Sequence, residues 1–570
     1  MDPTAPRTRP TTHPLQPRHR PAVAVTYRRA VTVTSRAPAS RPVPSPTAQA
    51  DVRLAAVPSR VAWVLALGGG LLCRYAFPDP GWWPLAPIAV AMLTVACWGR
   101  TIGRGAGLGL VFGLAFFIPL LSWSGVYVGA VPWLALAGLQ SLYLALLGAA
   151  VTVALRWSVR GSTSLAGVLV AAVWVGQEAL RDRTPYGGFP WARLAFSQAD
   201  SPLGHLAALG GAPLVTFGAA LVGALLAVAV VSVLHRPRPV AALLAGAAAV
   251  AVAAIGLAVP LPVTGQQVRV AGIQGDVPEA GLDFNAERRA VLDNHARVTR
   301  ELADRVASGR AQQPDLVVWP ENGSDLDPYL QQDARDVIDG AVSAIAAPTL
   351  VGAVLRRPTD RLTNASIVWT PGSGPGELYA KRHPVPFAEF IPDRGFYRLF
   401  TSKVDLVQED FVAGHRVGTL HLGPATVGVA ICFEVAYDDL VRDTVRGGAD
   451  LLVVQTNNAT FGRTDEAVQQ LAMSRLRAIE HGRAVAHVST VGVSALIEPD
   501  GTMVTTSSLF EPAALEAQLP LRTQLTWADR LGGWPEAVLS AVALLGVALQ
   551  LVRSRARRAP AVGDDVSLAG

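Results

Sequence analysis

The first half of the chain is a succession of long apolar runs, which few environments other than a membrane accommodate. A helix needs about 20 apolar residues to cross the hydrocarbon core of a bilayer. The candidate spans lie at 59–77, 82–98, 105–127, 131–155, 164–180, 204–234, 239–261 and 534–552. Three glycines interrupt the first run, and the sixth is long enough for two shorter pieces. Only 16% of the residues are charged, whereas soluble domains have about a quarter. We therefore expect an α-helical transmembrane bundle of about eight spans, seven of them within 58–262.

The charge of the connecting loops predicts how these spans are oriented, because short cytoplasmic loops collect Lys and Arg. Arginines lie in alternate connections, at 53 and 60, 100 and 104, 156 and 160, and 236 and 238. The loop at 181–203 breaks this pattern with three arginines. On balance we expect a multi-pass protein of the plasma or inner membrane. Both termini would be cytoplasmic, and the polar segment 266–518 would be extracytoplasmic.

The two ends of the chain are basic. Residues 1–57 are rich in Pro, Arg, Thr and Ser without apolar periodicity, which predicts a disordered tail. A second tail, 553–570, begins with four arginines between positions 553 and 558. Such tails suit an anionic membrane surface, and no aromatic or folded segment beside them points to a nucleic-acid partner.

The polar part of the chain, 266–518, has the composition of a globular domain. Runs rich in β-branched residues, such as VRVAGIQ, DLVVWPE and ATVGVAICFE, alternate with stretches of helical spacing at 284–308 and 464–483. This alternation predicts an α/β or layered αββα domain. A linker at 519–533 would join it to the last span, 534–552. Because membrane spans flank the domain on both sides, we expect a substrate carried in the lipid.

Three residues near the ends of β-like runs suggest nucleophilic chemistry. Cys432 follows ATVGVAI and precedes a helical stretch, a position that lowers a thiol's pKa when a helix N-terminus faces it. Glu321 ends VVWPE and would serve as a general base if it lay near the thiol. Lys381 lies among apolar residues and prolines, where a fixed ammonium stabilises an oxyanion. Taken singly, each also fits a buried cysteine, a loop acid or an exposed lysine.

Two further acids, Glu389 and Glu434, lie close in sequence to Lys381 and Cys432. Either would hold the lysine in place through an ion pair, and either would equally be an ordinary salt-bridge partner.

The combination of these residues is more specific than any one of them. Glu, Lys and Cys occur in that order, 60 and 51 positions apart, within the contexts WPE, Tyr-x-Lys and Cys-x-Glu. This pattern resembles the nitrilase or carbon-nitrogen hydrolase superfamily. With eight spans around the domain, the chain resembles the apolipoprotein N-acyltransferase family. Three more segments support that likeness, namely PVPFAEFIP at 384–392, GGFPWARLAFSQ at 187–198 and LTWADRLGGW at 525–534.

The resemblance implies a nitrilase-like fold and a two-step acyl transfer. A phospholipid would acylate Cys432, and the α-amine of the diacylglyceryl-cysteine that begins an apolipoprotein would take the acyl group. By motif, Glu321 would be the general base and Lys381 the oxyanion stabiliser, with Glu389 and Glu434 as supporting acids. No cofactor and no metal are expected.

Some positions depart from the family pattern and put substrate preference in question. Phe433 replaces a frequent Tyr, Ala388 a usual Gly, and NNATFG at 457–462 lacks an Asp and a Trp. We expect Trp191, Phe433 and Phe461 to line the access route for substrate. For Trp191, an interfacial anchor is an equally good interpretation.

Two alternatives remain open from the sequence. The first is a membrane-tethered amidase or nitrilase-type hydrolase that passes the acyl group to water. The second is a scaffold for a polyprenol-phosphate mannosyltransferase, which the Arg- and Pro-rich N-terminal tail would recruit.

Overall fold

A computed structural model describes residues 56–570 except 161–162, 236–237, 278–287, 359–360 and 557–570. Nearly all of the predicted disordered tail, 1–57, and most of the predicted tail at 553–570 lie outside the described residues. The disorder of these tails therefore stays a prediction.

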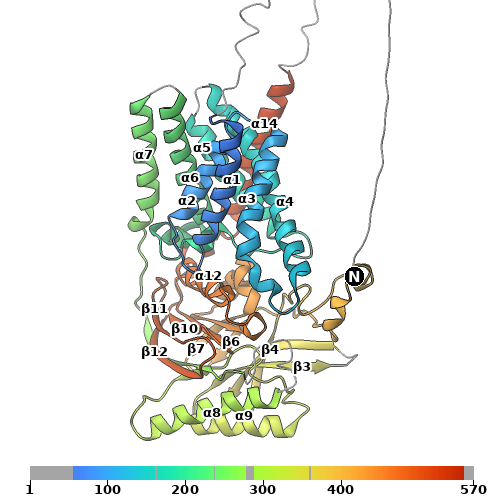
Figure 1. The fold of residues 1–570 in the computed structure, drawn as a ribbon. Helices are drawn as coiled ribbons and strands as arrows, with labels where there is room; N and C mark the ends of the chain where they lie inside the picture. The colour runs from blue at the N-terminus through green and yellow to red at the C-terminus, as the bar shows by residue number, and fades with distance from the viewer. Residues whose placement is uncertain (1–55, 161–162, 236–237, 278–287, 359–360, 557–570) are drawn as a thin grey trace, which may run out of the picture. The chain divides into compact units, whose positions relative to one another are not determined.

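Apolar helices form a bundle (Figure 1). They are α1 (Ser59–Tyr75), α2 (Leu85–Cys97), α3 (Ile102–Leu120), α4 (Ala130–Ala154), α5 (Thr163–Arg181), α6 (Ala207–His235), α7 (Pro239–Ala254) and α14 (Trp534–Ala556). Within the described ranges, five segments are long and apolar enough to cross a membrane: Ile102–Leu120, Ala130–Trp157, Pro202–Leu234, Pro239–Ala258 and Trp534–Ala556. Helix α2 is apolar but shorter. The helical membrane part is thus present, and eight complete crossings stay a prediction.

Glycines explain two irregularities that the sequence shows in the spans. Helix α1 runs unbroken through its three glycines, and a Cβ atom on Gly70 would collide with the carbonyl oxygen of Phe112 in α3. Small residues allow this close approach of helix backbones. Helix α6 does break, at Gly210 and Gly211. A Cβ atom on Gly211 would lie 2.8 Å from Oε1 of Glu480 in the polar domain. The glycine therefore allows α6 to pack closely against that domain where the helix breaks.

The polar domain contains two six-stranded sheets. The first has the order β12-β1-β2-β3-β4-β5. Its strands are β1 (Gln266–Gln274), β2 (Leu316–Val318), β3 (Thr349–Arg357), β4 (Arg361–Thr370), β5 (Gly374–Ala380) and β12 (Ala513–Leu521). The second has the order β11-β10-β9-β8-β7-β6. Its strands are β6 (Thr419–Leu422), β7 (Ala425–Ile431), β8 (Leu451–Thr456), β9 (Val485–Ser489), β10 (Ala495–Ile497) and β11 (Met503–Thr506).

Both sheets have parallel pairs at their centres, β1-β2-β3 in the first and β7-β8-β9 in the second. The carboxyl ends of parallel strands meet at one edge of a sheet, which is where ligands commonly bind in such sheets. Strand β12 pairs with β1 as far as Leu521, so the sheet continues past residue 518 into the segment predicted as a linker.

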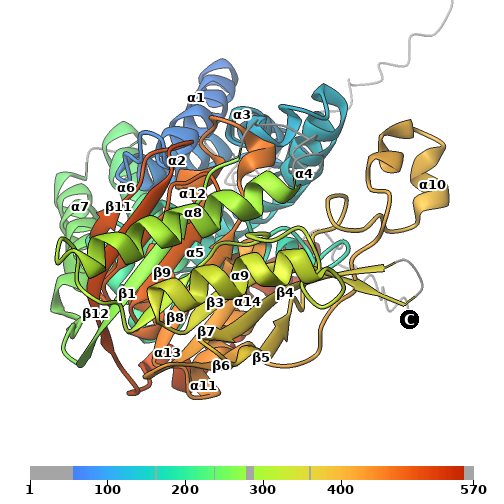
Figure 2. The same cartoon turned by 90° about the horizontal axis from the view of Figure 1, so that it is seen from below.

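Side-chain alternation along the strands builds a four-layered domain. In β1, Val268 and Val270 face the second sheet, whereas Ala271 and Ile273 face helices α8 (Arg288–Ala307) and α9 (Gln332–Ile345). Figure 2 shows α8 and α9 side by side over the first sheet. Helices α11 (Asp438–Arg446) and α12 (Glu466–His481) cover the second sheet. The predicted αββα sandwich is confirmed.

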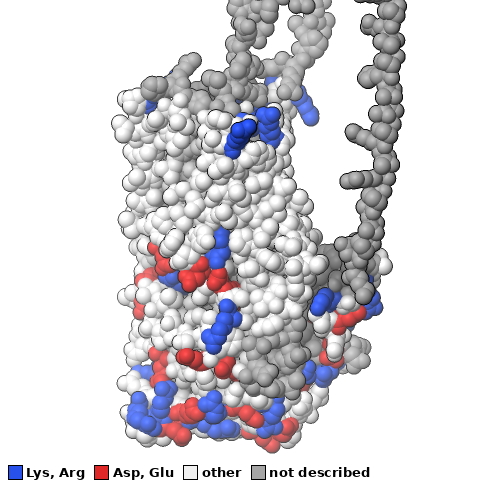
Figure 3. All heavy atoms as spheres, in the orientation of Figure 1, with Lys and Arg blue, Asp and Glu red and all other residues white. Residues whose placement is uncertain are grey.

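Charge is distributed unevenly between the bundle and the domain. On the face shown in Figure 3, described Lys and Arg side chains gather near the upper end of the bundle. Below them is a band without charged side chains, and charges of both signs return toward the polar domain. Charged groups are costly in hydrocarbon, so this band matches the part of the bundle that lipid would surround.

Buried charges join the bundle to the polar domain. Asp438, the first residue of α11, accepts hydrogen bonds at 2.7 Å from both Arg193, in the loop after α5, and Arg477 of α12. Arg477 also donates to the carbonyl oxygens of Val435 and Ala436 at 2.8 and 2.9 Å. Burial raises the pKa of Asp438, but the two arginines outweigh burial and hold that pKa well below its usual range. One carboxylate therefore connects the membrane part, α12 and the turn after Cys432.

We expect Asp438→Asn to lower the free energy of unfolding by about 2–4 kcal/mol, because two buried guanidinium groups lose their shared carboxylate. Thermal unfolding of the purified chain in detergent measures the change. Asp439→Asn is the matched control, since Asp439 is exposed and should change stability by less than about 0.5 kcal/mol. Equal effects of the two substitutions would contradict a structural role for Asp438.

Candidate active site

The structure places the three predicted chemical residues just beyond strand ends. Glu321 lies shortly after β2, Lys381 directly after β5, and Cys432 directly after β7. Contacts across the two sheets fix this edge: the Gln455 amide of β8 donates to the Trp319 carbonyl oxygen at 2.6 Å. The Thr490 hydroxyl donates to the Glu321 carbonyl oxygen at 3.0 Å. The backbone that carries the glutamate is thereby held against the sheet that carries the cysteine.

Lys381 is buried between two carboxylates. Its Nζ atom lies 3.2 Å from Oε1 of Glu321 and 2.9 Å from Oε2 of Glu389. Burial lowers the pKa of Lys381, but the negative charges of Glu321 and Glu389 outweigh it and raise that pKa well above its usual value. The two carboxylates therefore favour the charged ammonium form of Lys381.

Asn364, in β4, was not anticipated from the sequence. Its Nδ2 atom donates to Oε1 of Glu321 at 2.6 Å and to Oε1 of Glu389 at 3.1 Å. The backbone carbonyl oxygen of Asn364 accepts from the backbone N–H of Lys381 at 2.9 Å. The only hint in the sequence is an amide directly before the apolar run ASIVW, in a strand, where Asn is normally rare.

The two supporting acids have different partners. Glu389 pairs with Lys381, which is one of the two predicted possibilities. Glu434 is fully buried and makes no ion pair with the lysine among the described contacts. Its carboxylate accepts from the Tyr379 hydroxyl at 2.9 Å and from the backbone N–H groups of Ile431, Arg382 and His383 at 2.8, 2.7 and 3.0 Å. Glu434 thus ties the end of β7 to the segment after β5.

Cys432 has a left-handed backbone, with φ of 55°, which turns its side chain out of the line of β7. Burial raises the pKa of the Cys432 thiol to about 12, the charge of Glu321 adds to this rise, and Lys381 opposes it. The expectation of a lowered thiol pKa is therefore wrong. Only a five-residue 3-10 turn, Cys432–Ala436, follows the cysteine, and α11 begins later, at Asp438.

The thiolate is the nucleophilic form of a cysteine, so attack by the protonated Cys432 thiol requires a base. Burial raises the pKa of Glu321, the Lys381 ammonium lowers it, and the Glu389 charge raises it again, leaving it above its ordinary value. A carboxylate with a raised pKa is a better proton acceptor. The arrangement supports proton transfer from Cys432 to Glu321, followed by attack of the sulfur on a carbonyl carbon.

The three predicted access residues lie in one aromatic cluster. The Trp191 and Phe433 rings stack with centroids 5.8 Å apart, and Phe461 packs edge-on against Trp123 with centroids 5.0 Å apart. Trp123 and Trp191 join the two pairs, with centroids 5.1 Å apart. The Trp191 side chain is only 2% exposed, so it lies behind the surface rather than at a membrane interface. A role of these rings in substrate access stays a prediction.

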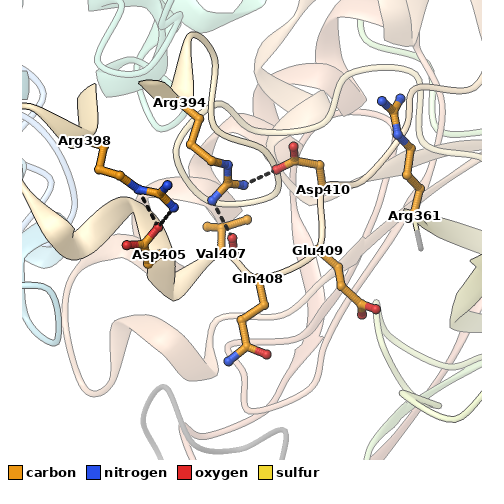
Figure 4. A pocket seen from close by; sticks show the side chains of 8 residues that line it. All are labelled: Arg361, Arg394, Arg398, Asp405, Val407, Gln408, Glu409 and Asp410. Carbon is orange, nitrogen blue, oxygen red and sulfur yellow. Dashed lines mark hydrogen bonds and ion pairs between the residues drawn. The ribbon is translucent and has the colours of Figure 1, made fainter. Parts of the chain in front are cut away.

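A separate pocket of about 480 Å³ lies beside α10 (Arg394–Arg398), and Figure 4 shows its polar lining. The Arg394 guanidinium contacts Asp410 at 2.5 Å, and Arg398 pairs with Asp405. The predicted chemical residues do not line this pocket.

Comparison with known proteins identifies the family of this chain. Residues 69–225 match the apolipoprotein N-acyltransferase N-terminal domain family, and residues 269–528 match the carbon-nitrogen hydrolase family. An apolipoprotein N-acyltransferase of Mycolicibacterium smegmatis is 41% identical over 85% of this chain and 84% of that protein. The chain belongs to the apolipoprotein N-acyltransferase family. A second relative of the same name, from Pseudomonas putida, is 32% identical over 86% of this chain and 97% of its own length.

Solved structures give a much weaker likeness. A carbon-nitrogen hydrolase from Helicobacter pylori is 14% identical, with a TM-score of 0.35 over 44% of this chain and 89% of that one. An amidase from Nesterenkonia sp. is 17% identical, with a TM-score of 0.32 over 46% and 93%. Both likenesses cover less than half of this chain.

Membership in the apolipoprotein N-acyltransferase family confirms the resemblance, the fold class and the enzyme class inferred from the sequence. The chain is a membrane acyltransferase. The comparisons do not favour the hydrolase or scaffold alternatives, and nothing in them supports a mannosyltransferase partner.

The electrostatics of this family member predict how fast Cys432 reacts with an alkylating reagent. The rate should rise with pH without a plateau below about pH 10, because the pKa of the thiol is about 12. Glu321→Gln should lower the rate at fixed pH about threefold or more, because it removes the carboxylate that would take the thiol proton before the sulfur attacks. Intact-mass measurement of the alkylated chain gives the rate.

Glu377→Gln is the control for that experiment, because Glu377 is exposed and pairs with His421 on the surface. It should leave the alkylation rate unchanged. A faster reaction in Glu321→Gln would show that the carboxylate acts on the thiol only by raising its pKa, which would contradict proton transfer from Cys432 to Glu321.

Proposed function

We propose that this chain transfers an acyl chain from a phospholipid to the α-amine of the diacylglyceryl-cysteine at the start of an apolipoprotein, through a thioester on Cys432. Family membership provides the reaction class. The observation that carries the residue assignment is the buried Lys381 ammonium between Glu321 and Glu389, close enough to lower the pKa of Cys432.

In the first half-reaction, Glu321 takes the proton of the Cys432 thiol. The sulfur then bonds to the ester carbonyl carbon of the phospholipid, and Lys381 faces the negative charge that develops on the carbonyl oxygen. The carbon–oxygen bond breaks, and the lysophospholipid oxygen receives the proton held by Glu321. The acyl chain is now a thioester, a reactive intermediate with a good leaving group.

In the second half-reaction, the amine of the acceptor attacks the thioester carbonyl carbon. Glu321 takes a proton from the amine, the carbon–sulfur bond breaks, and an amide forms. The proton on Glu321 then returns to the sulfur. Both substrates are lipids of one membrane, so the bilayer brings them to the same site at high local concentration.

We also propose that the catalytic domain lies on the outer side of the membrane. Arg553 and Arg555 occupy the last turn of α14, the end that points away from the domain in Figure 1. Exposed Trp82, Trp527 and Trp534 lie outside the helix interiors or at their first residues, where aromatic side chains favour the interface between lipid and water. Arginine at the far end supports a cytoplasmic location for that end.

Cys432→Ser should abolish N-acylation of lipoproteins, because a serine hydroxyl is a far poorer nucleophile and leaving group in this site. Mass spectrometry of a lipoprotein N-terminus, from cells that carry only the variant, measures the loss. Cys97→Ala is the control: Cys97 is buried in α2, and acylation should continue. Amide-linked acyl chains in Cys432→Ser cells at the wild-type level would contradict the proposal.

Single cysteines test the proposed orientation. In a chain whose Cys432 has been replaced, Ser308→Cys lies on the exposed surface directly after α8. It should react with a membrane-impermeant maleimide in intact cells. Arg555→Cys, at the exposed end of α14, should react only after permeabilisation. The reverse labelling pattern would place the catalytic domain in the cytoplasm and contradict the proposal.

A further inference from the structure

The Gln470 carboxamide, in α12, lies against the sulfur of Cys432. Its Nε2 atom is 3.5 Å from Sγ, a hydrogen-bonding distance for sulfur, and the side chain is fully buried. The mechanism above assigns Gln470 no role. It approaches the sulfur from a helix, whereas Glu321 and Lys381 come from strand ends.

The contacts of Gln470 determine which end of its amide faces the sulfur. Its Oε1 atom accepts from the Thr456 hydroxyl at 2.7 Å and from Nδ2 of Asn458 at 3.0 Å. Because both neighbours donate to the oxygen, the nitrogen is left to point at Sγ.

Asn458 is itself fixed from two sides. Its Nδ2 atom donates to Oε2 of Glu466 at 2.6 Å, and its Oδ1 atom accepts from the Ser489 hydroxyl at 2.7 Å. Rotating the Gln470 amide would bring its NH₂ group against the NH₂ group of Asn458. Rotating both amides would turn the Asn458 oxygen toward the Glu466 carboxyl group. The orientation of the donor is therefore set by buried partners beyond it.

We propose that Gln470 is a further catalytic residue, whose amide N–H donates a hydrogen bond to Sγ of Cys432 when the sulfur carries negative charge. This inference rests on the proposed function. Negative charge appears on the sulfur twice: when Glu321 removes the thiol proton, and when the carbon–sulfur bond of the thioester breaks. A neutral donor stabilises the thiolate on both occasions without taking part in proton transfer.

The charged groups around the sulfur show what this donor adds. Burial and the charges of Glu321 and Glu466 raise the pKa of Cys432, whereas Lys381 and the neighbouring Thr456 hydroxyl lower it. Lys381 shares its charge with two carboxylates, so it opposes this rise only in part. A hydrogen bond to a charged group is stronger than one between neutral groups. The Gln470 amide therefore favours the thiolate in a site where burial and two carboxyl groups outweigh the groups that lower the thiol's pKa.

Gln470→Glu and Gln470→Leu test the inference in the full-length protein in detergent. Glutamate keeps the shape and the acceptor for Thr456 and Asn458, and leucine removes the donor without adding charge. In both variants, alkylation of Cys432 by iodoacetamide at fixed pH should slow about tenfold, the change expected for a rise of about one pKa unit. With phospholipid and acceptor present, formation of the acyl-enzyme and its transfer to the acceptor should both slow, because each step passes through negative charge on the sulfur.

Gln469→Leu is the matched control on the same helix. Gln469 is also buried, but its Oε1 atom accepts from Nε1 of Trp191 at 2.8 Å, away from the sulfur. It should leave the alkylation rate of Cys432 unchanged, whatever it does to the stability of the bundle contact.

The possible outcomes separate the inference from the function on which it rests. Wild-type alkylation rates in both Gln470 variants would overturn the role of Gln470 while leaving Cys432 as the nucleophile. If Gln469→Leu slowed alkylation as much as the Gln470 variants do, the role of Gln470 would also be overturned, because the effect would then reflect general disturbance of α12. Acyl transfer that survives Cys432→Ser would overturn the proposed function, and this inference with it.

Discussion

The buried ammonium of Lys381 is the constraint around which the candidate site is arranged. A buried cation is very unfavourable without partners, so the fold must bring carboxylates to it. Glu321 and Glu389 provide them at 3.2 and 2.9 Å, and Asn364 bridges the same two carboxylates. The stability of this part of the domain and the position of the proposed base therefore depend on the same contacts.

Cys432, the proposed nucleophile, is held by both parts of the chain. Cys432 begins a turn whose Val435 and Ala436 carbonyl oxygens are bound by Arg477, and Arg477 shares Asp438 with Arg193 of the loop after α5. The ring of Phe433 stacks on Trp191 of that same loop. An enzyme that acts on lipids benefits from this arrangement, because the loop that leaves the membrane part also positions the sulfur that we propose reacts.

The sequence predicted the parts of this site that depend on local pattern. Apolar runs indicated the bundle, and the ends of β-like runs located Glu321, Lys381 and Cys432. It did not predict Asn364 or Gln470, because their roles depend on how sheets and helices stack over long sequence separations. It also gave the wrong direction for the pKa of Cys432, since burial and the charge of Glu321 outweigh any effect of a nearby helix. The Arg193–Asp438–Arg477 contact joins residues 245 and 39 positions apart, beyond any local signal.

The most direct test of this account is to find where the acyl chain is attached in the intermediate. The purified chain would be incubated with a phospholipid that carries a defined acyl chain, without acceptor, then digested and analysed by mass spectrometry. The account predicts that the added acyl mass lies on the peptide that contains Cys432 and is released by hydroxylamine, as a thioester requires. An acyl chain on any other residue, or transfer activity without a Cys432 adduct, would contradict it.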